Sequence, residues 1–291
     1  MSWFNLKILT KPDQADYFTD CFLELGAVSV TYEDAADQPL YEPALGETPL
    51  WQQTCVVALF PIEIAVDEIL LALIEKEGAA ITKQLKFEPL PDENWALAWR
   101  AHFKPLRFGH LWICPDQTDV PDPKAPAVFL SPGLAFGTGT HPTTALCLEA
   151  LSDYSLQNLN ILDYGCGSGI LALAALKLGA SHALCVDHDP QAILATRNNA
   201  QQNQFTEAEL TTQLAEDFLP QHFDLVIANI LAKPLIHLAP LLINSTRPGG
   251  QIILSGILAS ESLEVQKAYS NDILWEKINQ REGWVILVGT R

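Results

Sequence analysis

Residues 161–189 read ILDYGCGSGILALAALKLGASHALCVDHD, and this stretch decides the fold of the chain around it. A short apolar strand passes through a glycine-rich turn into a helix of alanine and leucine, which ends before Gly179. A second apolar strand ends on Asp187, about 20 residues beyond the first glycine of the turn. This order of strand, turn, helix and strand predicts a nucleoside-binding half of a parallel α/β sheet.

The spacing of the glycines distinguishes between classes of cofactor. Gly165, Gly167 and Gly169 form the pattern G-x-G-x-G, whereas a dinucleotide fingerprint would need a glycine in place of Ile170. Glycine lets the backbone approach a ligand closely, and Asp187 is placed to accept hydrogen bonds from ribose hydroxyls. No phosphate is required, so the turn favours S-adenosylmethionine. Such turns also occur for packing alone, but the flanking strand and helix and the acid favour the cofactor interpretation.

Composition indicates a globular protein of one large or two ordinary domains, with 291 residues, 48% of them hydrophobic and 18% charged. The sequence has no apolar run of about 18 residues and no basic N-terminal region followed by an apolar core. We therefore expect a cytoplasmic protein with no contact with membranes. Six cysteines without any C-x-x-C pair give no sign of a metal site or a disulfide framework.

Charge is unevenly distributed along the chain. Of the formal net charge of −18, residues 1–95 carry −12, because 17 aspartates and glutamates there face 5 lysines and arginines. An acidic surface repels nucleic acid and favours a basic partner, although acidic faces also serve solubility. We expect no direct nucleic-acid binding, and the charge alone leaves a basic protein partner and plain solubility open.

The first 90 residues predict a small α+β domain. Strands are expected at 3–9, 27–32, 54–60 and 81–87, with helices at 13–25 and 63–77. The order βαββαβ is the ferredoxin-like pattern, a four-stranded antiparallel sheet with two helices on one face. That fold has no chemistry of its own, so we interpret residues 1–90 as a substrate-recognition domain.

A linker helix is expected over residues 91–104. Trp95, Trp99 and Phe103 recur at helical spacing and form one stripe, which either packs the helix between two domains or contacts substrate.

We expect residues 105–291 to form the catalytic domain. Short strands are expected within 104–115 and 127–130, and a turn at Gly249–Gly250. The strands that follow residue 189 are expected at 210–214, 224–228, 251–255, 273–280 and 284–289.

Seven strands in this order predict a Rossmann-like, class I S-adenosylmethionine-dependent methyltransferase domain, whose last two strands form a hairpin. Ahead of the glycine turn lies a second loop, FGTGTHPTT at 136–144, which enters a helix near Pro142. It lacks the lysine of a phosphate-binding loop. Its hydroxyls and backbone N–H groups suit a carboxylate such as that of methionine, and a plain capping loop is the alternative. Phe136 and Thr138 are therefore candidate cofactor-binding residues.

The segments FGTGTHPTT, LDYGCGSGILALAALKLGA, VDHDP and ANILAKPL, in this order and spacing, closely resemble the ribosomal protein L-eleven methyltransferase (PrmA) family over the whole chain. The resemblance implies several methyl transfers from S-adenosylmethionine to lysine ε-amines and the N-terminal α-amine of one large-subunit ribosomal protein. It maps cofactor contacts onto four residues, which are Thr144, Gly165, Asp187 and Asn229. Asp163 and Gly167 from the glycine turn complete the set of candidate cofactor-binding residues.

Methyl transfer is an in-line displacement from a sulfonium, so the protein mainly aligns donor and amine and excludes water. Asn229 is the candidate catalytic residue, since its side chain accepts a hydrogen bond from the attacking amine. General amino-methyltransferases carry N-P-P-Y here, and this chain has Asn229-Ile230-Leu231-Ala232, as the family does. His141 is either a proton acceptor or a structural histidine.

Two other functions stay open. A methyltransferase of the same fold acting on another protein, RNA or a small molecule would need a different first domain. A non-catalytic S-adenosylmethionine-binding module would require a degraded site, and the set Asp163, Gly165, Asp187 and Asn229 argues against decay. We expect a monomer.

Overall fold

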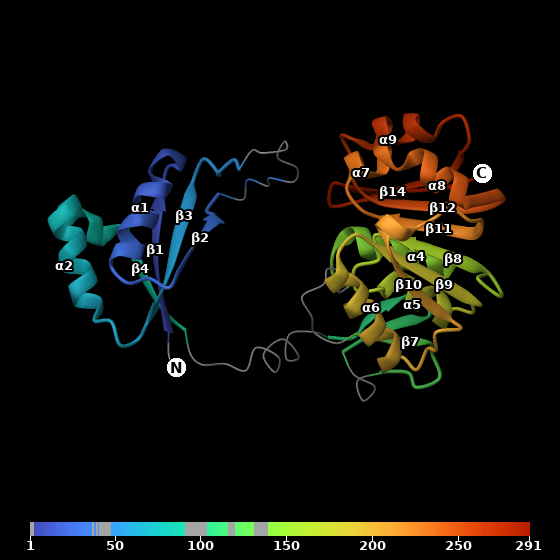
Figure 1. Cartoon of the computed structure of the whole chain (residues 1–291), viewed down its shortest axis with the longest axis horizontal. Coiled ribbons are helices and arrows are strands. Elements are labelled where there is room, and N and C mark those ends of the chain that lie inside the picture. The colour runs from blue at the N-terminus through green and yellow to red at the C-terminus, as the bar shows by residue number, and fades with distance from the viewer. Residues whose placement is uncertain are drawn as a thin grey trace. The chain divides into compact units, whose positions relative to one another are not determined.

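A computed structural model describes residues 3–36, 38, 40, 48–90, 104–115, 120–130 and 139–291. The chain divides into two compact units, Met1–Trp95 and Ala96–Arg291 (Figure 1). The linker helix expected over 91–104, with its stripe of Trp95, Trp99 and Phe103, lies outside the described residues except for Lys104.

The N-terminal unit contains one four-stranded sheet with the order β2-β3-β1-β4, in which all neighbouring strands are antiparallel. Its elements are β1 (Trp3–Thr10), α1 (Pro12–Glu24), β2 (Ser29–Asp34), β3 (Thr54–Pro61), α2 (Val66–Glu77), the 3₁₀ turn η1 (Ala79–Lys83) and β4 (Leu85–Leu90).

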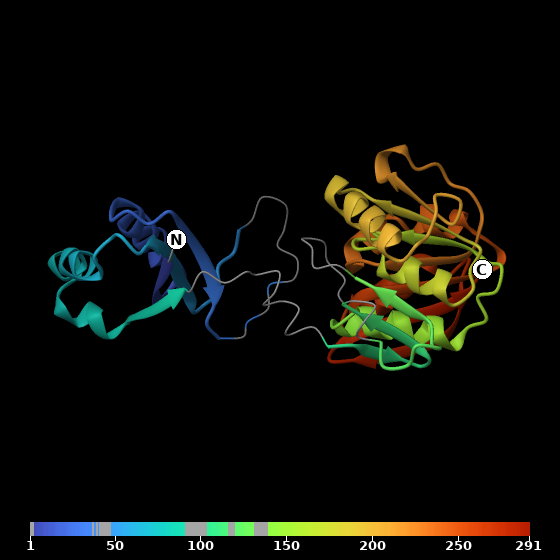
Figure 2. The same cartoon turned by 90° about the horizontal axis from the view of Figure 1, so that it is seen from below.

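Buried and more exposed side chains alternate along β1, and the buried side chains form the core of this unit. In β1, Phe4, Leu6 and Ile8 are buried and lie opposite Phe60, Ala58 and Val56 of β3. Both helices cover this face of the sheet, as Figures 1 and 2 show. On the other face, the Lys7 ammonium lies 3.3 Å from the Glu33 carboxylate and 3.0 Å from that of Glu88.

The strand expected at 81–87 is wrong in its first half. Gly78 ends α2 with a φ of +83°, and the chain continues as η1 before β4 begins at Leu85. Ile81 is buried within η1 and joins the core between the helices and the sheet, so its apolar character reflects that packing and not a strand.

The C-terminal unit is built on a seven-stranded sheet with the order β10-β9-β8-β11-β12-β14-β13. The first five strands in this order pair in parallel, and β14 is antiparallel to both β12 and β13. The strands are β8 (Asn160–Tyr164), β9 (His182–Asp187), β10 (Leu210–Leu214), β11 (Phe223–Asn229), β12 (Thr246–Leu258), β13 (Leu274–Arg281) and β14 (Trp284–Thr290).

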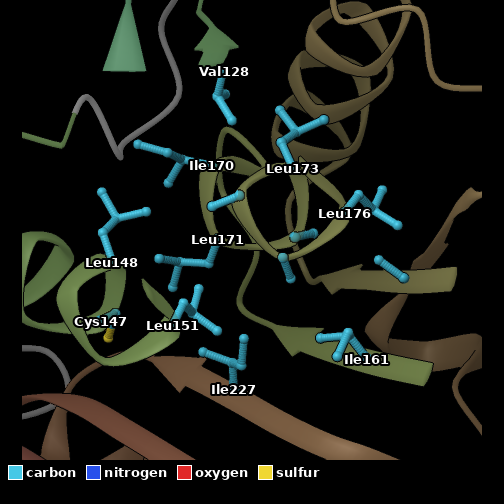
Figure 3. Packing of buried hydrophobic residues seen from close by; sticks show 14 of the residues in the cluster. Val128, Cys147, Leu148, Leu151, Ile161, Ile170, Leu171, Leu173, Leu176 and Ile227 are labelled. Atoms are coloured by element: carbon cyan, nitrogen blue, oxygen red, sulfur yellow. The ribbon is translucent and has the colours of Figure 1, made fainter. Parts of the chain in front are cut away.

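Helices cover both faces of this sheet (Figure 1). One face packs on α4 (Pro142–Asp153), α5 (Ile170–Lys177) and α6 (Pro190–Gln202), and the other on α7 (Ala232–His237), α8 (Ala239–Ser245) and α9 (Ser262–Tyr269). Helix α5 is apolar all round, as expected of a fully buried helix. Figure 3 shows Leu171 of α5 near Leu151 of α4 and Ile227 of β11.

The short strands expected within 104–115 and 127–130 are present, and one expectation, the turn at Gly249–Gly250, needs correction. The segment 104–115 forms two strands, β5 (Leu106–Phe108) and β6 (Leu111–Cys114), which join β7 (Ala127–Phe129) in a separate three-stranded sheet. The turn expected at Gly249–Gly250 lies inside β12. There the Gly249 N–H donates to the Arg291 carbonyl at 2.7 Å and the Arg291 N–H donates to the Gly250 carbonyl at 2.9 Å, so the C-terminus holds the two glycines in the sheet.

Candidate functional site

The glycine turn lies at the carboxyl end of β8 and is fastened to the neighbouring strand. Gly165, Gly167 and Gly169 have φ values of +80°, +53° and +77°, which a Cβ atom disfavours. The N–H groups of Gly165 and Cys166 both donate to the Val186 carbonyl in β9, at 2.7 and 3.1 Å. The turn between β8 and α5 is therefore held against the carboxyl end of β9.

Asp187, the last residue of β9, also holds the turn. Its Oδ2 accepts a hydrogen bond from the Gly167 N–H at 2.9 Å, and its Oδ1 accepts one from the Asp189 N–H at 3.0 Å. The side chain is 9% exposed, and the His188 imidazole lies 3.3 Å away. Since each carboxylate oxygen has two lone pairs, the group retains acceptor capacity for a ligand after both backbone bonds are made.

Asp163 lies deeper, with 1% of its surface exposed. Its Oδ2 accepts a hydrogen bond from the Ala172 N–H of α5 at 3.1 Å, and its Oδ1 has no partner among the described residues. Burial raises the pKa of this carboxyl to about 7, and repulsion from Asp187 acts in the same direction, whereas the bond from Ala172 opposes them. An unpaired buried oxygen of this kind favours a cation or a donor next to it.

Asn229 and Thr144 meet across 85 positions of sequence. Asn229 ends β11 and Thr144 lies in the first turn of α4, where it is 4% exposed. The Asn229 Nδ2 donates to the Thr144 Oγ1 at 3.3 Å. With the Asn229 amide nitrogen bonded to Thr144, the Asn229 Oδ1 is available to accept a hydrogen bond from another group. The start of α4 and the end of β11 therefore present one side-chain carbonyl oxygen beside the sheet.

A comparison with known proteins gives the family. The model of the ribosomal protein L11 methyltransferase (PrmA) family matches residues 2–291. This chain belongs to the PrmA family. It is 49% identical over 294 residues to the ribosomal protein L11 methyltransferase of Sodalis glossinidius and 47% identical over 292 residues to that of Azotobacter vinelandii, each alignment covering 100% of both chains.

A solved structure of the same family is also similar. The ribosomal protein L11 methylase from Lactobacillus delbrueckii subsp. bulgaricus is 31% identical, with a TM-score of 0.58, and the alignment covers 65% of this chain and 99% of that one. The likeness places the fold of the PrmA-family chain among the mixed α/β methyltransferases.

His141 forms the N-terminal cap of α4. Its Nδ1 accepts a hydrogen bond from the Thr143 N–H at 3.3 Å and lies 2.7 Å from the Thr143 Oγ1. The ring meets Trp284 edge-on, with 5.1 Å between the ring centres. Since one ring nitrogen is engaged in the cap, the geometry favours the structural interpretation of His141 over proton transfer.

Two candidate residues, Phe136 and Thr138, lie outside the described residues. Among the residues that the structure does describe, no group of three or more histidine, cysteine, aspartate or glutamate side chains is placed to hold a metal ion. Within the same residues, no helix has the length and apolar character needed to cross a membrane.

Sequence reasoning missed the irregular stretch of β12 next to this site. The β12–β14 pairing jumps from Leu254↔Leu287 to Ile257↔Val285, so Ser255 and Gly256 lie opposite Ile286 alone. A single glycine inside an apolar strand is the sequence signal for such a bulge.

Proposed function

We propose that this chain transfers methyl groups from S-adenosylmethionine to amino groups of ribosomal protein L11, namely lysine ε-amines and the N-terminal α-amine. Membership of the PrmA family over the whole chain is the observation that carries this conclusion. The site supports it, because the residues that the resemblance names lie at the carboxyl ends of β8, β9 and β11 or, for Thr144, bonded to the end of β11.

The residues present fit the cofactor. S-adenosylmethionine supplies an activated methyl group on a sulfonium and carries positive charge. Asp187 retains acceptor capacity for the ribose hydroxyls, and the unpaired Oδ1 of Asp163 favours a positive charge nearby. The turn at Gly165 and Gly167 lets backbone approach the nucleoside, and Thr144 with Phe136 and Thr138 serves the methionine part.

Asn229 orients the attacking amine. The amine must be neutral to attack, although lysine has a pKa of about 10.4 in water and the α-amine one of about 7.7–8.0. Desolvation next to a sulfonium lowers both values. The nitrogen then forms a bond to the methyl carbon as the carbon–sulfur bond breaks, and the excess proton passes to solvent. With its Nδ2 bonded to Thr144, Asn229 offers Oδ1 to an N–H of the amine and directs the lone pair.

The N-terminal unit recruits the protein substrate in this proposal. We assign residues 1–90 to the ferredoxin-like class from their strand order, residues 91–104 to a linker and residues 105–291 to the catalytic domain. The net charge of −12 on residues 1–95 suits a basic ribosomal protein. We further propose a monomeric, cytoplasmic enzyme that binds no nucleic acid directly.

The test uses the purified full chain. Calorimetry with S-adenosylmethionine should show binding at one site, and incubation with purified ribosomal protein L11 should raise the mass of that protein by successive methyl groups. Peptide mapping should place these groups on lysine side chains and the N-terminus. Cofactor binding without any gain in mass would point to a different acceptor, and no binding would reject the proposal.

A further inference from the structure

The chain that leaves β11 packs against two glycines of other elements. Asn229 is the last residue of β11, Ile230 forms a bend, and α7 begins at Ala232. Gly165 of the cofactor turn and Gly256 of β12 both adopt left-handed backbone angles, with φ of +80° and +82°. Both lie against Ile230, the residue that follows the proposed amine-orienting asparagine.

The two contacts differ in kind. A Cβ at Gly165 would meet only the Ile230 side chain, colliding with its Cγ2. A Cβ at Gly256 would lie 2.7 Å from the Ile230 carbonyl carbon and 3.0 Å from its backbone nitrogen, and closer still to its carbonyl oxygen. Real Cβ atoms do not approach backbone this closely, so the Ile230 backbone would have to move.

The pairing of the strands shows why Gly256 occupies this place. The β11–β12 ladder ends at the pair Asn229↔Ser255, and the β12–β14 ladder is interrupted at Ser255 and Gly256. The Ser255 Oγ donates to the Val285 carbonyl at 3.1 Å, which fastens the bulge to β14. Bulges of this kind re-aim neighbouring groups and occur beside active sites.

We propose that Gly256 is a positioning residue for methyl transfer: the bulge of β12 provides the close backbone contact that fixes Ile230 and thereby aims Asn229 at the attacking amine. The inference rests on the proposed function, since it concerns the alignment of the amine at that same site. Displacing the Ile230 backbone moves the adjoining Asn229, whereas Asp187 is held by the N–H groups of Gly167 and Asp189 and not by Ile230. A misplacement of about 1 Å costs roughly 100-fold in rate.

The full-length variant Gly256→Ala tests this inference, with Gly283→Ala as its matched control. Gly283 has a φ of +80°, and a Cβ there would meet nothing within 4 Å, so both variants carry the same backbone strain but only one displaces Ile230. If Gly256→Ala fails to fold, Ser255→Ala serves as the second variant, because it removes the bond that fastens the bulge to β14 without adding an atom.

The measurements are melting temperature, affinity for S-adenosylmethionine and single-turnover methylation of ribosomal protein L11 at saturating cofactor and protein. We expect Gly256→Ala to lose about 100-fold in rate per folded molecule, and Ser255→Ala to lose rate as well. Both should bind cofactor within about 3-fold of the unmodified chain, and Gly256→Ala should melt below Gly283→Ala because its Cβ crowds the Ile230 backbone. Wild-type transfer rates in folded Gly256→Ala or in Ser255→Ala, or an equal loss in Gly283→Ala, would overturn the inference. An unmodified chain that transfers no methyl group would instead reject the proposed function, and the inference with it.

Discussion

The two units of the chain bury polar side chains to different extents. Among the described residues, the N-terminal unit buries only the hydroxyl side chains of Thr10 and Thr54, whereas the C-terminal unit buries two carboxylates and several amides and hydroxyls. Several of these hold the glycine turn, since the Thr196 Oγ1 donates to the Gly167 carbonyl and the Asn199 Nδ2 to the Ser168 carbonyl.

Net charge is distributed in the opposite way: residues 1–95 carry −12 of the net charge of −18, although they bury few polar side chains. Burying a polar group costs free energy unless the group is hydrogen-bonded. The many buried polar groups of the C-terminal unit therefore indicate that hydrogen bonds fix the positions of its side chains, as a reaction site requires. Exposed charge acts at longer range and suits the capture of a partner. Under the proposed roles of the two units, changes in one should affect substrate capture and changes in the other cofactor binding and methyl transfer.

The largest expected effect concerns the buried carboxyl of Asp163. Its pKa is raised from 3.8 to about 7, so between these values the folded protein holds a proton that the unfolded chain has lost. The contribution of Asp163 to the free energy of unfolding is therefore fully present below pH 4. It is lost as the pH rises through 7, which lowers the free energy of unfolding by up to about 4 kcal/mol. Asp163→Asn should remove this loss.

Urea unfolding of both proteins from pH 4 to pH 8 checks the prediction. The free-energy difference between Asp163→Asn and the unmodified chain should shift in favour of the variant as the pH rises. If the difference does not change with pH, the carboxyl is ionised in both the folded and the unfolded state. That result would contradict the conclusion that burial in the C-terminal unit shifts its pKa.

A somewhat smaller effect is expected for the ribose site. Asp187→Ala removes a charged acceptor, which should weaken cofactor binding by roughly 2–4 kcal/mol, or about 30- to 1000-fold. Calorimetry with S-adenosylmethionine measures this, and Asp272→Ala, at an exposed position, serves as the control. Unchanged affinity in a folded Asp187→Ala protein would show that the ribose is held elsewhere.

The effect of Asn229→Ala should appear in rate and not in binding. Alignment acts mainly in the transition state, so single-turnover methylation at saturating cofactor should fall by about 100-fold while cofactor affinity changes little. Thr144→Val should cost less, because Asn229 keeps its carbonyl oxygen, and Thr144→Ser should retain the rate. A near-normal rate for Asn229→Ala would assign the asparagine to cofactor binding.

Salt should produce the smallest effect, and only on the acidic unit. Attraction between exposed charges is screened over about 10 Å at 0.1 M and about 3 Å at 1 M. If ribosomal protein L11 is captured through its positive charge, raising the salt concentration should increase the KM for it several-fold and leave cofactor affinity nearly constant. Equal losses in both would show that the charge of residues 1–95 does not act in substrate capture.

Local pattern was sufficient to predict much of this molecule. The turn at Gly165 and the acid Asp187 were predicted from residue types at fixed spacing, and the parallel strands around them were predicted from short apolar runs, because both signals are local. The first half of the strand expected at 81–87 was wrong, because Ile81 is an apolar residue buried by a 3₁₀ turn and in the sequence it resembles a buried strand residue.

Contacts between residues far apart in the chain could not be predicted from the sequence. The bond between Asn229 and Thr144 joins residues 85 positions apart, and no periodic pattern indicates it. The contact of Gly256 with the Ile230 backbone depends on an interrupted ladder, which one glycine in a strand signals only weakly. The raised pKa of Asp163 likewise arises from burial by the assembled sheet and α5.

Removal of residues 1–90 tests the separation of the two roles most directly. The remaining chain and the full chain are compared in S-adenosylmethionine binding and in methylation of purified ribosomal protein L11. The proposed separation of roles predicts unchanged cofactor affinity and loss of methylation in the shortened protein. Methylation at the rate of the full chain would contradict it.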